Sequence, residues 1–141
     1  MSYTVYTFGY EAYKITDLDV EVKRLGAIVV DVRFSPYARN DAKFNRAELQ
    51  QRYGAKYVWI QELGNKNYRN GKPIEFMDEA LGARRLGGIT SDGTSVILLC
   101  GCQDRTTCHR TELAKRLNEE CGWDVRHLPE GMMEDGDLFA E

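Results

Sequence analysis

The residues with the most reactive side chains lie in one short segment, CGCQDRTTCHR, at positions 100–110. It holds three cysteines, one histidine and two arginines within eleven positions. These residue types can bind a metal ion, form a reactive thiolate, bind an anion, or simply pack in a core. The segment follows the strand-like stretch SVILLC and precedes a helical pattern. It therefore occupies a strand-to-helix connection, where α/β proteins commonly bind ligands.

An anion site is the first hypothesis for this segment. The free amides and the dipole of a helix N-terminus favour anions, and Arg105 and Arg110 would add two cations beside them. Arg33 follows another predicted strand, and Arg39 lies in the same loop as Arg33, so both are further ligand-binding candidates. Asp31 stands next to that loop, and the sequence allows it either to contact the ligand or to form an ion pair with Arg33.

Cys108 is the candidate for a reactive thiol. It falls in the first turn of the predicted helix, beside His109 and close to arginines, and such surroundings favour the thiolate form. In an enzyme, Cys108 would be the nucleophile and His109 the acid or base. Arg110 would complete the catalytic set, and the reaction would be hydrolysis or group transfer at a phosphate or glycosidic centre. A redox sensor is an alternative use of the same thiol.

Zinc binding is another alternative for this segment. Cys100, Cys102, Cys108 and His109 offer enough sulfur and nitrogen atoms for one tetrahedral zinc ion. Their spacing differs from the usual Cys-x-x-Cys turn, and Cys100 ends a predicted buried strand, where a small thiol packs well. We therefore assign no metal ligand and no cofactor. A non-catalytic zinc-binding or protein-interaction module stays open as the alternative function.

The rest of the chain alternates between strand-like and helix-like patterns. Strands are expected at residues 3–8, 27–32, 56–60, 95–100 and 123–128. Helices are expected between them, at about residues 16–25, 46–53, 74–86 and 111–121. This alternation predicts an α/β fold, a small Rossmann-like three-layer sandwich around a mostly parallel five-stranded sheet.

Local signals set several of the expected boundaries. Thr16 and Asp19 resemble a capping box at the start of the first helix. The glycine-rich stretch GGITSDGT, residues 87–94, is expected to form a turn after the third helix. Cys121 falls on the apolar face of the last helix, so it is predicted to lie in the core.

Composition and charge indicate a globular protein. The chain has 141 residues, 43% of them hydrophobic and 29% charged, and no apolar run of membrane-spanning length. The first residues lack the pattern of a secretory signal, so we expect a cytoplasmic location, without membrane association and without structural disulfides.

The acidic residues are unevenly distributed. Residues 130–141 contain five of them and no Lys or Arg, so we expect a single α/β domain over residues 1–129 and a mobile acidic tail over residues 130–141. The predicted domain then has 19 basic and 17 acidic residues, which is compatible with a nucleotide or nucleic-acid partner.

Four segments of the chain together resemble the family of uncharacterised proteins that contain domain of unknown function (DUF) 488. They are YTFGY, DVRFSP with a later Phe44, ELGN, and LLCGCQDRTTCHR. The Cys-His-Arg ending of the last segment is the most specific element. The resemblance implies a compact α/β domain whose shared polar residues gather at one edge of the sheet, and it covers most of the chain.

The resemblance also implies site residues. Arg33, Cys108, His109 and Arg110 match the family's motif residues, and Cys100 and Gly64 match less discriminating ones. Cys102 stands where similar members carry an acidic residue, and Asp104 is an acidic residue nearby. No reaction follows from the resemblance. Taken together, the sequence predicts an anion-binding pocket for a nucleotide or a nucleic-acid phosphate at the carboxyl edge of the sheet.

Overall fold

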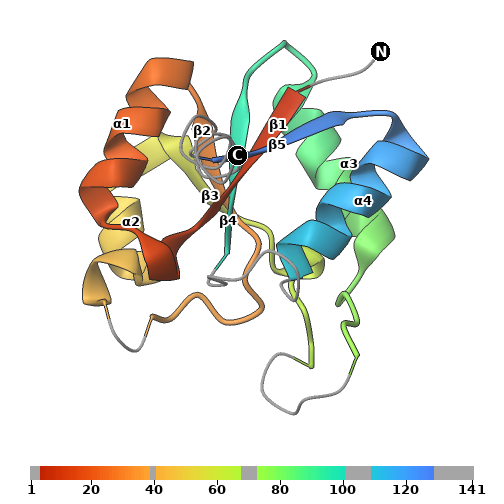
Figure 1. The fold of residues 1–141 in the computed structure, drawn as a ribbon, viewed down its shortest axis with the longest axis horizontal. Coiled ribbons are helices and arrows are strands. Elements are labelled where there is room, and N and C mark those ends of the chain that lie inside the picture. The colour runs from red at the N-terminus through yellow and green to blue at the C-terminus, as the bar shows by residue number, and fades with distance from the viewer. Residues whose placement is uncertain (1–3, 39–40, 68–72, 101–108, 129–141) are drawn as a thin grey trace, which may run out of the picture.

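The computed structural model describes residues 4–38, 41–67, 73–100 and 109–128, and these form an α/β fold (Figure 1). The strands are β1 (Thr4–Gly9), β2 (Ile28–Asp31), β3 (Tyr57–Trp59), β4 (Val96–Cys100) and β5 (Asp124–Leu128). The α-helices are α1 (Ile15–Leu25), α2 (Arg46–Tyr53), α3 (Glu79–Thr90) and α4 (His109–Cys121). The strand order is β3-β2-β4-β1-β5, and every pair is parallel. The predicted fold class is confirmed.

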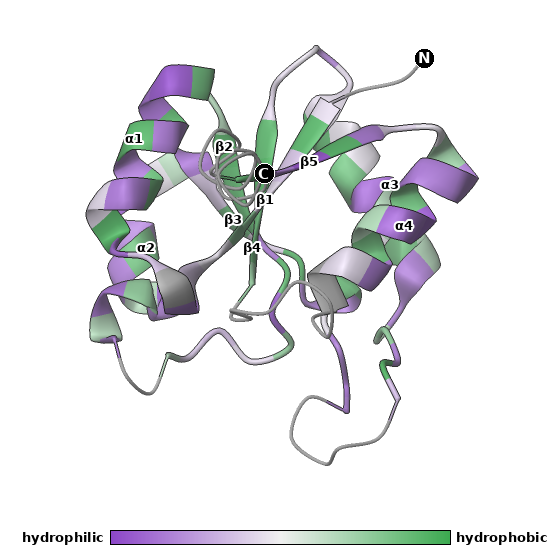
Figure 2. Cartoon of the chain, viewed as in Figure 1, coloured by the Kyte–Doolittle hydropathy of each residue, from purple (hydrophilic) through white to green (hydrophobic). Residues whose placement is uncertain are grey.

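The helices cover both faces of the sheet. Helices α1 and α2 lie on one face, and α3 and α4 lie on the other (Figure 1). Two apolar clusters fill the spaces between the layers. The cluster under α1 and α2 includes Phe8, Leu18 and Leu49, and the cluster under α3 and α4 includes Leu98 and Leu113. Figure 2 shows the matching pattern, with hydrophobic strands at the centre and hydrophilic residues on the outer helix surfaces.

The central strand β4 differs from its two neighbours in where the chain goes next. From β4 the chain passes to α4, whereas from β1 and β2 it passes to α1 and α2 on the opposite face. Adjacent connections that diverge in this way leave a crevice at the carboxyl ends of parallel strands, which is the usual ligand site of such sheets. The Cys100–Arg110 segment starts from β4, so the topology places its beginning at this position.

Three helices differ in position from the sequence expectation, and α4 differs only at its start, which is His109 instead of about residue 111. Helix α1 begins at Ile15, one residue before Thr16, and the backbone N–H of its N-cap residue Lys14 donates to Asp17 Oδ2 over 2.7 Å. Thr16 is therefore inside the first turn and is not the cap, because the extended backbone needed at the N-cap occurs at Lys14.

Helix α3 is shifted along the chain from the predicted residues 74–86 to Glu79–Thr90. Its N-cap is Asp78, whose carboxylate accepts from Leu81 N at 3.2 Å. The preceding residues are extended, because Phe76 forms an antiparallel bridge with Asn65. The predicted turn over residues 87–94 is thus wrong in its first half, where the helix continues. Leu86 and Thr90 on this last part of α3 are fully buried, and this packing outweighs the low helix propensity of glycine.

Candidate functional site

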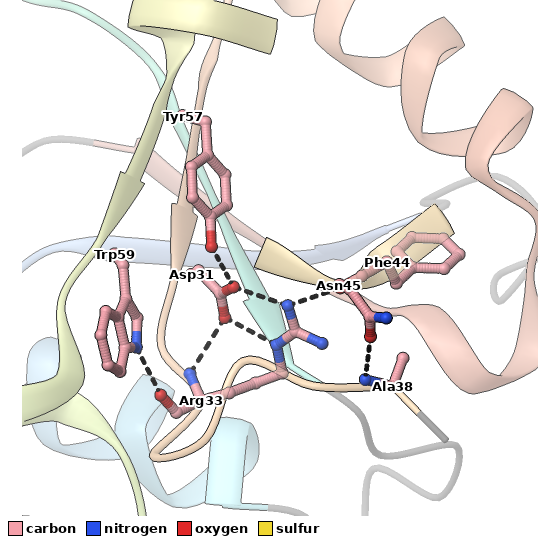
Figure 3. A network of polar contacts seen from close by, with 7 residues as sticks. All are labelled: Asp31, Arg33, Ala38, Phe44, Asn45, Tyr57 and Trp59. Atoms are coloured by element: carbon pink, nitrogen blue, oxygen red, sulfur yellow. Dashed lines mark hydrogen bonds and ion pairs between the residues drawn. The ribbon is translucent and has the colours of Figure 1, made fainter. Parts of the chain in front are cut away.

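A buried ion pair lies at the carboxyl end of β2. Asp31 is the last residue of this strand, and Arg33 follows two positions later. Arg33 Nε donates to Asp31 Oδ1 at 2.8 Å, and Arg33 Nη2 donates to Asp31 Oδ2 at 2.6 Å (Figure 3). The side chains are 6% and 0% exposed, for Arg33 and Asp31 respectively. Of the two roles that the sequence left open for Asp31, the structure shows the ion pair.

The Asp31 carboxylate accepts two further hydrogen bonds. Arg33 N donates to Oδ1 at 3.2 Å, and the Tyr57 hydroxyl donates to Oδ2 at 2.5 Å. Tyr57 reaches Asp31 because β3 is paired with β2 and its side chain lies on the same face of the sheet. Four donors therefore converge on one buried carboxylate, which fixes the orientation of the Arg33 guanidinium.

Aromatic residues surround the guanidinium on the α1–α2 side of the sheet. The Arg33 Cζ atom lies 5.3 Å from the ring centroid of Tyr10, and the Tyr10 ring stacks on Phe44 with centroids 4.8 Å apart. Arg33 Nη2 also donates to the carbonyl oxygen of Phe44 at 2.7 Å. Tyr10 follows β1, which is separated from β2 by β4. Arg33 therefore bridges two chain segments on either side of the central strand.

The Arg33 guanidinium keeps its positive charge over the physiological pH range. Burial disfavours the charged form of Arg33, but the hydrogen bonds and the negative charge of Asp31 outweigh it, so the pKa of Arg33 is raised. Burial raises the pKa of Tyr10 and, with the Asp31 charge adding to it, raises the pKa of Tyr57 strongly. Both phenols are therefore neutral, and Tyr57 keeps the proton that it donates to Asp31.

The backbone after Arg33 is held in place by the end of β3 and the residues that follow it. Trp59 Nε1 donates to the carbonyl oxygen of Arg33 at 2.8 Å, and Gln61 Nε2 donates to that of Phe34 at 2.9 Å. Gly64 packs directly on this backbone, since a Cβ atom at Gly64 would lie 2.4 Å from Phe34 N. The ELGN segment therefore positions the DVRFSP segment through a close backbone contact.

One polar atom in this network has no partner in the part of the chain that the structure describes. Arg33 Nη1 is buried and makes no hydrogen bond with any residue that the structure describes. It is the arm of the guanidinium that points away from Asp31 (Figure 3). A buried donor without an acceptor costs about 1–3 kcal/mol, and native proteins rarely leave one unsatisfied. A group that accepts from Nη1 would therefore bind here with a free-energy advantage.

Several predicted site residues lie outside what the structure describes. Arg39, Arg105 and Cys108 are not among the described residues, and neither is Cys102. His109 and Arg110 are the first two residues of α4, which places their backbone at the start of that helix. The structure therefore brings Asp31 and Arg33 together, while the grouping of the other candidates stays a prediction.

The two described cysteines have different surroundings. Cys100 is fully buried in the cluster under α3 and α4, so it lies on the opposite face of the sheet from Asp31. The prediction that Cys100 packs in the core is confirmed. The same prediction for Cys121 is wrong, because this thiol is exposed on the last turn of α4, where Trp123 covers the core instead. Within the described ranges, no cluster of three or more potential metal ligands occurs.

Sequence reasoning assigned no site role to the aromatic residues around Arg33. Tyr10 and Phe44 appeared in the segments that carry the family resemblance, but nothing indicated their contact with Arg33. Tyr57 and Trp59 are two positions apart in KYVWI, so they share one face of a strand. This alternation could have predicted that two aromatic side chains with polar atoms lie at the same edge of the sheet as Asp31.

Comparison with known proteins decides the family. The model of the family described as Domain of unknown function DUF488 matches residues 18–117. The chain belongs to the DUF488 family. The matched range runs from α1 into α4 and includes Asp31, Arg33 and the whole Cys100–Arg110 segment. Neither the curated proteins nor the solved structures include a match to this chain.

In the ranges that the structure describes, no helix is long and apolar enough to cross a lipid bilayer.

Proposed function

We propose that this DUF488 chain binds a nucleotide, or a nucleotide unit of a nucleic acid, at the carboxyl edge of its sheet. The buried Nη1 atom of Arg33, which has no hydrogen-bond partner among the described residues, is the observation that supports this proposal most directly. It lies at the end of β2, beside the central strand whose connection diverges from those of its neighbours. A preorganised donor in that place suits a ligand with hydrogen-bond acceptors.

The Cys100–Arg110 segment supplies the second support. This segment begins at the end of β4 and ends in the first turn of α4. Its sequence contains Arg105 and Arg110, and the helix N-terminus that it leads into favours anions. We assign these two arginines to the phosphate of the ligand, with Arg39 as a further candidate. If the protein also catalyses a reaction of this ligand, Cys108 is the proposed nucleophile and His109 is the proposed acid or base.

The proposal predicts nucleotide-dependent stabilisation of the folded chain. A ligand at a hundred times its Kd adds about 2.7 kcal/mol of stability, which raises the midpoint of thermal unfolding by several degrees. The measurement is thermal unfolding of the purified protein with a panel of nucleoside mono-, di- and triphosphates. The upward shift is expected to fall at least threefold in the Arg110→Ala variant.

The control variant is Arg84→Ala, which removes an exposed arginine from α3 and should respond to nucleotides as the wild type does. Loss of the shift in both variants would indicate a general effect of charge. The proposal is wrong if no nucleotide changes the unfolding midpoint of the wild-type protein.

A further inference from the structure

The charge of Arg33 is already balanced within the protein. Two of its three guanidinium nitrogens bond to the Asp31 carboxylate, at 2.8 and 2.6 Å, and Nη2 also bonds to the Phe44 carbonyl oxygen. Arg33 and Asp31 together carry no net charge. An arginine that binds phosphate normally offers two parallel N–H groups and an unpaired positive charge. Arg33 can offer only Nη1, and its positive charge is paired.

We propose that Arg33 Nη1 donates to an uncharged acceptor on the base of the nucleotide, a carbonyl oxygen or a ring nitrogen, and does not bind the phosphate. This inference rests on the proposed function, and it makes Arg33 a specificity-determining residue. A hydrogen bond from a neutralised ion pair suits a neutral acceptor, because a phosphate at Nη1 would also be repelled by the nearby Asp31 carboxylate.

The surroundings of the guanidinium support the same assignment. Tyr10 and Phe44 contact Arg33 from the α1–α2 side, and both belong to the apolar cluster there together with the buried Ala38. Aromatic and aliphatic neighbours favour a flat, weakly polar base, whereas a phosphate group prefers several donors and water. Among the described residues, the guanidinium donates its hydrogen bonds to two groups, the Asp31 carboxylate and the Phe44 carbonyl oxygen.

The guanidinium is also rigid enough to read a base. Asp31 is fixed by Tyr57, and the Arg33 carbonyl oxygen is fixed by Trp59 Nε1 at 2.8 Å. A donor that is fixed before the ligand arrives loses little entropy on binding, and an analogue without the matching acceptor leaves it unsatisfied.

The test uses the guanidinium NMR signals of Arg33 in wild-type protein labelled with ¹⁵N and ¹³C, assigned through the side-chain carbons. The probes are inorganic phosphate, ribose 5-phosphate and the four common nucleoside monophosphates. We expect the Arg33 signals to move with at least one nucleotide and to stay in place with inorganic phosphate and ribose 5-phosphate. Arg33 signals that move with inorganic phosphate as far as with a nucleotide would overturn the inference.

Matched variants give a second readout. Arg33→Lys keeps the positive charge for Asp31 but loses the planar fork, so nucleotide affinity should fall at least tenfold while ribose 5-phosphate affinity changes less than twofold. Arg84→Lys makes the same change at an exposed arginine of α3, and it should leave both affinities unchanged. An equal loss of affinity for both ligands in Arg33→Lys would also contradict the inference.

The two proposals fail in different ways. If no nucleotide binds to the wild-type protein at all, the proposed function fails, and this inference fails with it. If nucleotides bind and shift the protein's other signals but leave those of Arg33 unmoved, the proposed function stands and only the role of Arg33 is wrong. The NMR arm uses wild-type protein, so it gives an answer even if Arg33→Lys does not fold.

Discussion

Asp31 and Arg33 depend on each other for their burial. Removing either partner of a buried ion pair costs about 3–5 kcal/mol, because the remaining charge loses its compensation. The sequence placed both residues at the end of a buried strand, so their location could be predicted. Tyr10 and Tyr57 could not be assigned to them, since each belongs to another strand segment and the contacts exist only once the strand order is set. Phe44 lies in the connection after β2, and its contact with Arg33 depends on how that connection folds back.

The hydroxyl of Tyr57 is the part of this network that can be removed most cleanly. Tyr57→Phe deletes the donor to Asp31 Oδ2 and leaves the ring, so stability should fall by about 2 kcal/mol, the usual size for a hydrogen bond to a charged group. Urea unfolding measures this loss. Tyr37→Phe, at a side chain 66% exposed, should change stability by less than about 0.5 kcal/mol. Equal stability of the Tyr57→Phe variant and the wild type would show that the network does not need this donor.

Gly64 is required for space. Its backbone has φ −84° and ψ 154°, which any residue can adopt, but a Cβ atom would lie 2.4 and 2.5 Å from Phe34 N and Cα. Gly64→Ala should therefore destabilise the protein by about 3 kcal/mol, because backbone must move. Gly88→Ala, in α3 with nothing within 4 Å of the added atom, should stabilise it by about 0.5–1 kcal/mol. Chemical denaturation of both variants gives the comparison, and similar effects at both positions would contradict the proposed contact.

At the scale of elements, α1 and α2 are joined by a polar contact outside the core. Asp19 on α1 accepts from Arg52 Nε and from the Tyr53 hydroxyl on α2, each at 2.8 Å, and Arg52 Nη2 bonds to its second oxygen. The Arg52 hydrogen bonds are the largest cause that lowers the pKa of Asp19 below 3.8, and the Tyr53 hydroxyl adds to them. The two charged side chains are 38% and 35% exposed, so solvent weakens this contact.

The lowered pKa of Asp19 predicts a pH dependence. A carboxyl group with a depressed folded-state pKa stabilises the protein above its unfolded value of 3.8, and this contribution is lost as the pH falls through the lower folded value. Asp19→Asn should cost about 0.5–1 kcal/mol at pH 7, and the difference should vanish well below pH 3.8.

Urea unfolding of both proteins across this pH range measures the effect. Glu119→Gln on α4 serves as the control and should change stability little at either end. A constant difference between Asp19→Asn and the wild type at all pH values would contradict the assigned origin.

The elements also show where local sequence signals fail. Every expected strand and helix exists, because apolar periodicity reports burial directly. The position of α3 was wrong because two non-local features set it, the bridge between Asn65 and Phe76 and the packing of Leu86 and Thr90. Cys121 shows the same limit at a helix end, where the last residue of α4 is exposed and the core is covered by Trp123.

In the whole molecule, the strand order brings separate sequence segments together at one site. Because β4 lies between β1 and β2, the residues that follow these three strands share one edge of the sheet. The alternation of strands and helices predicted the parallel sheet and this edge. It could not predict the order β3-β2-β4-β1-β5, and therefore could not show that Arg33 reaches across to Tyr10.

Calorimetric titration of the wild-type protein with nucleotides is the sharpest test of nucleotide binding, since it counts sites and needs no assumption about a reaction. We expect one site per chain for at least one nucleotide, with affinity lost or at least tenfold weaker in Arg110→Ala and unchanged in Arg84→Ala. No binding heat with any nucleotide at several temperatures, or unchanged binding in Arg110→Ala, would contradict this expectation.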